Sequence, residues 1–146
     1  MAQLLAILAA VVFAAAQAAE PVAIVDTGEL MDIFLKPAYT ELQQSMVKPP
    51  TDRKEWATIY QKAVRLAELE NLLFFRNHEE VRKPEWLATS ARARQAAAEV
   101  ASAALLGLRT VKADNFDGVR AKYERVADTC NACHRTFARD AVTVKP

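Results

Sequence analysis

The sequence predicts an all-α fold, an antiparallel four-helix bundle that forms a single domain. Its 146 residues include only three glycines and six prolines and are rich in alanine, a composition that favours helices over sheets. Four segments carry apolar residues at steps of three or four, which is the period of a helix with one buried face. Short segments containing proline, glycine or several charges separate them.

The first predicted helix runs from about Asp26 to Met46. Pro37 interrupts it, but the apolar stripe keeps its phase across the proline, so we expect one kinked helix rather than two short ones. The segment Lys48-Pro49-Pro50 ends this helix. The expected inner positions are Leu30/Met31, Phe34/Leu35, Ala38, Leu42 and Met46.

The second predicted helix is capped by Thr51 or Asp52, and Glu55 has the spacing of a capping box with Asp52. It ends near Phe75, and the charged residues 76–83 form a loop. The expected inner positions are Trp56, Ile59/Tyr60, Ala63, Leu66/Ala67 and Leu73/Phe74.

The third predicted helix has Pro84 in its first turn, runs to about Leu106 and is ended by Gly107. So many small side chains on its inner face would let a neighbouring helix, or a flat ligand, approach closely. The expected inner positions are Leu87, Ala91, Ala97/Ala98, Ala101 and Ala104/Leu105.

The last predicted helix follows a cap at Asp114 or Asn115. Its apolar stripe includes both cysteines and one of the two histidines, so a ligand held by them would project into the interior. The stripe consists of Phe116, Val119, Tyr123, Val126/Ala127, Cys130, Cys133/His134 and Phe137.

The motif Cys130-Asn131-Ala132-Cys133-His134 is typical of covalent haem attachment. Residues i, i+3 and i+4 share one face of a helix, so two thiols and an imidazole can meet the same macrocycle. Two thioether links would hold the haem, and His134 would ligate its iron. The alternatives are a dithiol or disulfide, which as a thioredoxin-like pair would need a βαβ setting, and a zinc site, which needs further ligands.

The N-terminus resembles a secretory signal peptide. An apolar run from Leu4 to Ala16 is followed by Ala16-Gln17-Ala18, which predicts cleavage before Ala19 and export to the periplasm. This run is too short for a membrane span, which needs about 20 apolar residues. An uncleaved membrane anchor or a soluble helix is the alternative. We expect residues 1–18 to be removed and residues 19–146 to form the mature domain.

The charge balance argues against nucleic-acid binding, because 19 Lys and Arg residues and 18 Asp and Glu residues leave a formal net charge of +1. The final helix is nonetheless basic at Lys122, Arg125, Arg135 and Arg139. That face could attract an acidic redox partner.

Together, a signal peptide, four amphipathic helices and a C-terminal CxxCH resemble the class II cytochromes c, the cytochrome c-prime type of periplasmic four-helix bundle. Class I cytochromes carry the motif near the N-terminus instead. The resemblance covers essentially the whole of the expected mature chain, residues 19–146. It implies one covalent haem c, with Cys130 and Cys133 as thioether sites and His134 as the proximal ligand.

In this family the sixth coordination position faces the first helix. Residues 29–37 and 56–73 resemble the subset whose members offer a methionine sulfur there, which makes Met31 the expected distal ligand. The alternatives are a vacant site lined by Phe34, ligation by Met46 or His78, and Met31 as a core side chain only. Five-coordinate members commonly carry a first-helix arginine near a haem propionate. Residues 25–28 contain none, and Arg82 is a candidate substitute.

Coordination separates the expected functions. With His134 and Met31 both bound, the iron stays low-spin, which suits transfer of single electrons between periplasmic redox partners. With an open distal side, the protein would bind nitric oxide or carbon monoxide. No enzyme is indicated, and a structural role ranks third. Bundles of this family often pair through their first two helices, so a homodimer using Trp56, Tyr60 and Tyr39 is a further expectation.

Overall fold

The computed structural model describes residues 22–76, 79 and 83–146 of the chain, and every regular element in these ranges is helical. This confirms the predicted all-α class. The predicted signal peptide 1–18, together with His78 and Arg82, lies outside the described residues. The elements are α1 (Thr27–Leu30), η1 (Met31–Leu35), α2 (Lys36–Gln44), α3 (Arg53–Glu70), η2 (Asn71–Phe75), α4 (Pro84–Thr110) and α5 (Asn115–Phe137).

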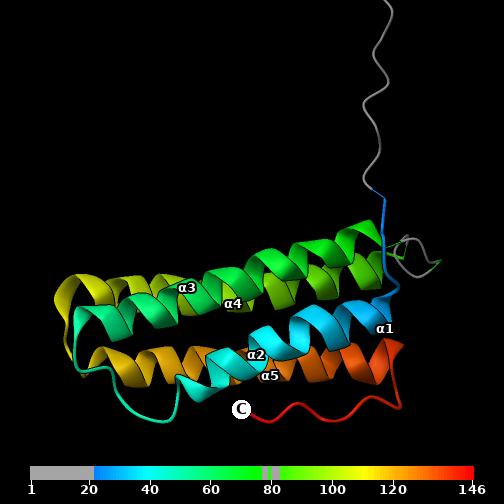
Figure 1. Cartoon of the computed structure of the whole chain (residues 1–146). Helices are drawn as coiled ribbons and strands as arrows, with labels where there is room; N and C mark the ends of the chain where they lie inside the picture. Colours follow the sequence, from blue (N-terminus) through cyan, green and yellow to red (C-terminus); the bar gives the residue numbers. More distant parts are fainter. Residues whose placement is uncertain (1–21, 77–78, 80–82) are drawn as a thin grey trace, which may run out of the picture.

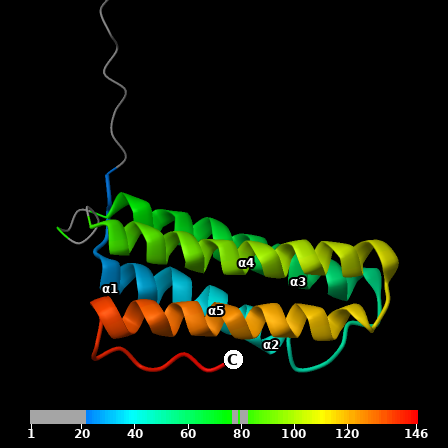
Figure 2. The ribbon, with the colours of Figure 1, turned by 180° about the vertical axis from the view of Figure 1, so that it is seen from behind.

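The helices lie side by side as four long rods, the first of which combines α1, η1 and α2 (Figure 1). Along the chain, α2 packs on α3, α3 on α4 and α4 on α5. Views from opposite sides show that α1, the start of α4 and the end of α5 lie at the same end of the molecule (Figures 1 and 2). That end is called the motif end below, because the last turns of α5 carry residues 130–134.

The first rod contains a π-helical turn directly before Pro37. The Lys36 backbone N–H donates to the Met31 carbonyl, five residues back, and Pro37 then occupies the first turn of α2. A proline at 37 has no N–H for the carbonyl four residues earlier, and a wider turn directly before it accommodates that loss. The turn also shifts the stripe, since buried Leu30 is followed by buried Leu35, a step of five.

Side-chain caps begin the first two rods. The Asp26 carboxylate accepts from the Glu29 backbone N–H at 2.8 Å, and the Glu29 side chain accepts from the Asp26 N–H. At α3, Asp52 accepts from the Glu55 N–H at 2.7 Å, as predicted. The Glu55 carboxylate, however, accepts from the backbone and the hydroxyl of Thr51 rather than from Asp52.

Gly107 does not end the third long helix, which corrects the sequence prediction. α4 continues to Thr110, and Val111 adopts the left-handed conformation at its C-terminus with φ 49°. A β-carbon at position 107 would overlap the indole of Trp56. This glycine is therefore required for a close approach of α3 to α4 and not for a helix cap.

The inner face of α4 is also rotated from the predicted one at its start. Leu87 is exposed, whereas Trp86 is buried and its indole N–H donates to the Leu73 carbonyl at 3.0 Å. Ala97, Ala101 and Ala104 are buried as expected.

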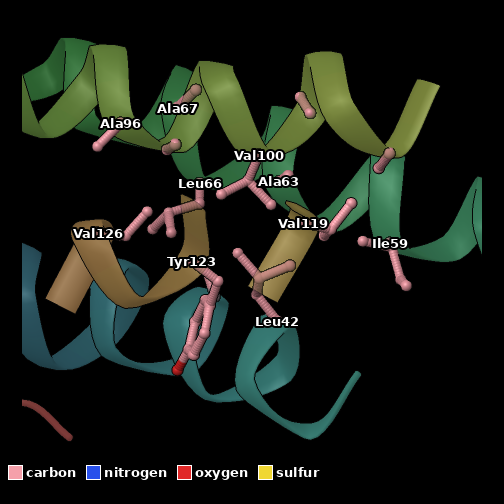
Figure 3. Packing of buried hydrophobic residues seen from close by; sticks show 14 of the residues in the cluster. Leu42, Ile59, Ala63, Leu66, Ala67, Ala96, Val100, Val119, Tyr123 and Val126 are labelled. Atoms are coloured by element: carbon pink, nitrogen blue, oxygen red, sulfur yellow. The ribbon is translucent and has the colours of Figure 1, made fainter. Parts of the chain in front are cut away.

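The core runs along the axis between the rods (Figure 3). Leu42 from α2, Ile59 and Leu66 from α3, Val100 from α4, and Val119 from α5 all reach it, and each is at most 2% exposed. Burial of such a side chain stabilises the fold by about 1.5–3 kcal/mol.

Within the described residues, no helix is both long and apolar enough to span a membrane.

Candidate functional site

Residues 130–134 lie in the last two turns of α5, and Cys130, Cys133 and His134 extend the stripe of core residues on that helix. Cys133 is buried, and Cys130 and His134 are partly buried. One turn further, Phe137 packs edge-to-face on Trp86 with ring centroids 5.1 Å apart, which ties the end of α5 to the start of α4. The two thiols and the imidazole thus share the interior-facing stripe that the spacing predicts.

Both cysteines are free thiols. Burial raises the pKa of the Cys130 thiol to about 12, and the charges of Glu70 and Cys133 add to that rise. Burial also raises the pKa of Cys133. Reactive redox cysteines instead have a lowered pKa, because the thiolate is the nucleophile. The environment therefore disfavours a thioredoxin-like dithiol and keeps both sulfurs protonated at neutral pH.

His134 is held as a neutral imidazole near pH 7. Burial lowers its pKa, and a hydrogen bond to the Val142 backbone opposes that effect. Its Nδ1 atom is buried and has no hydrogen-bond partner among the described residues. A neutral imidazole with a ring nitrogen that has no partner among the described residues is the state in which histidine ligates a metal.

These residues fit a covalently attached haem. The donor set consists of two protonated thiols and one neutral imidazole, all on one helical face, and Nδ1 of that imidazole is unpartnered among the residues described. Cys130 and Cys133 would hold the macrocycle, and His134 would supply a nitrogen ligand to iron.

The first rod is aligned with α5 by an aromatic pair. Tyr39 of α2 stacks on Tyr123 of α5, with ring centroids 5.4 Å apart and an angle of 29° between the ring planes. The two helices run in opposite directions (Figure 1). Burial is the main cause of the raised pKa of each tyrosine, and the Cys130 thiol raises both further. The motif begins seven residues after Tyr123 on the same helix.

This pairing gives the position of Met31 along the axis. Met31 lies eight residues before Tyr39, and Asn131 lies eight residues after Tyr123. Each displacement is roughly 10–12 Å toward the motif end, because an α-helix rises about 1.5 Å per residue and the π turn at residues 31–35 rises somewhat less. Met31 is therefore level with the middle of the motif, and its partly buried side chain packs against the core.

The alternative distal residues have different surroundings. Phe34 is 39% exposed, because the π turn directs Leu35 inward in its place, so the predicted inward position of Phe34 is wrong. Met46 is buried at the opposite end of the first rod, about 20 Å from Met31 along the axis.

Glu70 is a site residue that the apolar stripe of α3 did not reveal. It occupies the stripe position after Leu66 and Ala67, and it is only 3% exposed. Its Oε2 atom has no hydrogen-bond partner among the described residues, and burial raises its pKa to about 8. Because the charge of Glu70 contributes to the raised pKa of Cys130, this carboxyl group lies near the motif. A charged residue in phase with a buried stripe is the signal that could have identified it.

Two expected interaction surfaces are reduced by intramolecular contacts. Trp56 is fully buried, so it cannot contribute to a dimer interface, and Tyr39 and Tyr60 pack against the core. On the final helix, Lys122 and Arg125 both pair with Glu99 of α4.

Comparisons with protein-family models, with curated proteins and with solved structures found no match.

Proposed function

We propose that the protein is a periplasmic mono-haem c-type cytochrome that transfers single electrons between redox partner proteins. In this proposal Cys130 and Cys133 attach the haem, and His134 and Met31 are its axial ligands. The helices form an antiparallel four-helix bundle resembling the class II cytochromes c. When bound, the haem supplies a reversible one-electron iron couple.

The observation that carries the proposal is the state of the motif. Two unreactive thiols and a neutral imidazole share one face of a single helix, and within the part of the chain that the structure describes one ring nitrogen has no partner. This arrangement suits a haem that is attached once through the two sulfurs and ligated by the imidazole. It does not suit a redox thiol that is oxidised and reduced repeatedly.

The alignment of the first rod with α5 by Tyr39 and Tyr123 supports Met31 as the second axial ligand, because it brings the Met31 thioether to the level of the motif. Sulfur and imidazole ligands together favour low-spin iron, for which little reorganisation accompanies electron transfer. Around them, buried apolar side chains such as Leu30 and Leu35 exclude water and thereby influence the potential.

Export belongs to the same proposal. Cleavage before Ala19 would deliver residues 19–146 to a compartment where haem can be attached, and pairing of two copies through the first two rods remains part of the proposal. Tyr60 and Tyr39 are only partly buried and are the aromatic residues that could take part.

The test is expression of the full chain in a bacterial host with and without a haem-attachment system. The exported protein should carry covalent haem only with that system, and its reduced spectrum should show the sharp, split bands of a low-spin cytochrome. A broad Soret band together with binding of carbon monoxide would indicate that the protein binds gases rather than transfers electrons. Exported protein without haem in both hosts would contradict the proposal.

A further inference from the structure

The C-terminal segment 138–146 turns back after α5 and runs beside it (Figure 1). The Ala141 N–H donates to the Ala138 carbonyl at 2.9 Å, which closes the turn. The end of the segment reaches the first rod, where the Tyr39 hydroxyl donates to the Lys145 carbonyl at 2.8 Å and Gln43 Nε2 donates to the same oxygen at 3.0 Å.

Asn131, which lies inside the motif, holds this segment with both ends of its amide. Its Nδ2 donates to the Val144 carbonyl at 2.8 Å, and its Oδ1 accepts from the Val144 N–H at 2.8 Å. A side-chain amide offers a donor and an acceptor on one planar group, whereas Leu offers neither and ionised Asp offers acceptors only, so neither can reproduce the pair. Both bonds are partly shielded from water.

The same segment passes close to the imidazole of His134. Val142 precedes Val144 by two residues, and His134 follows Asn131 by three, so the two contacts lie within one helical turn of each other. The Val142 backbone acts on the His134 ring as a hydrogen-bond acceptor would, opposing the fall in the imidazole pKa, while Nδ1 has no partner in the described ranges. Metal-binding histidines are commonly oriented by a hydrogen bond of this kind, which also makes the imidazole a stronger electron donor.

We propose that Asn131 is the positioning residue for His134, because its amide clamps Val144 and so keeps the Val142 backbone against the imidazole. This inference rests on the proposed haem attachment. Asn131 does not touch the iron in this account, and its effect passes through the C-terminal segment.

The test compares three forms of the haem-loaded protein with the unmodified protein: Asn131→Leu, a deletion of residues 142–146, and the two combined. Loss of the hydrogen bond makes the imidazole a weaker donor, which destabilises the oxidised iron. We expect the redox equilibrium to shift toward the reduced state by a factor of about three to ten, where ten corresponds to about 59 mV. The combined form should shift no further than the deletion alone.

A second readout does not depend on haem. Asn131→Leu should release the C-terminal segment and speed its trimming by carboxypeptidase severalfold. Asn115→Leu is the matched control, since it removes a 2.7 Å side-chain bond to Thr110 at the other end of the same helix and should change neither readout.

The outcomes are distinguishable. An unchanged potential in either Asn131→Leu or the deletion form, with haem still attached, overturns the positioning role. If Asn131→Leu fails to fold, the deletion form alone decides, because it leaves the sequence of every helix intact. Absence of covalent haem from the unmodified protein overturns the proposed function instead.

Discussion

The ring of Tyr39 stacks on the ring of Tyr123, and this contact between the first rod and α5 joins residues 84 positions apart in the sequence. Counting outward from it along two antiparallel helices brings Met31 level with Asn131. Met46 occupies the other end. The pair therefore distinguishes two methionines that both lie on the predicted apolar stripe of the first helix.

Met31→Ala should convert the haem-loaded protein from low-spin to high-spin and allow carbon monoxide to bind, because the iron loses its sixth ligand. Optical spectra of both oxidation states measure this change. Met46→Ala is the matched control. It should lower the free energy of unfolding by about 2–5 kcal/mol, as expected for a buried methionine, and leave the spectrum unchanged. A low-spin spectrum in Met31→Ala would remove Met31 from the site.

Replacement of both Cys130 and Cys133 by Ser should release the haem into acidified organic solvent, since no thioether link remains. Each single replacement should keep the haem attached through the other sulfur. The measurement is a haem stain after denaturing electrophoresis. Covalent haem in the double variant would contradict the attachment sites.

Glu70→Gln should stabilise the protein increasingly as the pH rises. The pKa of Glu70 is raised from 4.5 to about 8 by burial, so between these values the folded chain keeps a proton that the unfolded chain has lost. Stability is therefore highest at low pH and falls with rising pH by about 1.4 kcal/mol per unit from this group.

Urea unfolding of wild type and Glu70→Gln between pH 5 and pH 8 checks this, with the exposed Glu68→Gln as control. The difference between wild type and Glu70→Gln should grow across that range, whereas Glu68→Gln should follow the wild type. A constant difference for Glu70→Gln would show that the carboxyl group does not titrate in this window.

Two glycine substitutions test the close approach of α3 and α4. Gly107→Ala should lower the free energy of unfolding by about 1–3 kcal/mol, because the new methyl group overlaps the Trp56 indole. Gly118→Ala, in α5 with open space around the added carbon, should instead stabilise the helix by up to about 1 kcal/mol. Thermal unfolding of both variants gives the comparison, and equal shifts would argue against the tight contact.

The extents of the helices follow closely from the sequence, because apolar periodicity, Asp26, Asp52 and Pro84 are local signals that the folded chain keeps. The motif face of α5 follows for the same reason. It is harder to predict which of two neighbouring apolar residues is buried. Phe34 and Leu35 are both hydrophobic, and the π turn decides between them. The packing of α4 decides between Trp86 and Leu87.

The remaining features depend on contacts between distant residues. A glycine at position 107 resembles the residue that commonly follows the end of a helix. Its actual role, to make room for the Trp56 indole of α3, is evident only from the packed structure. The bonds from Asn131 to Val144 need the chain to reverse after α5. The level of Met31 depends on the Tyr39–Tyr123 pair, which no local pattern encodes.

The central claim is that a haem is covalently bound to Cys130 and Cys133. Its most direct test is the intact mass of the periplasmic protein from a host that attaches haem, followed by mapping of the peptide that contains residues 130–134. We predict the processed chain beginning at Ala19 plus the mass of one haem on that peptide. A processed chain with both thiols unmodified would contradict the account.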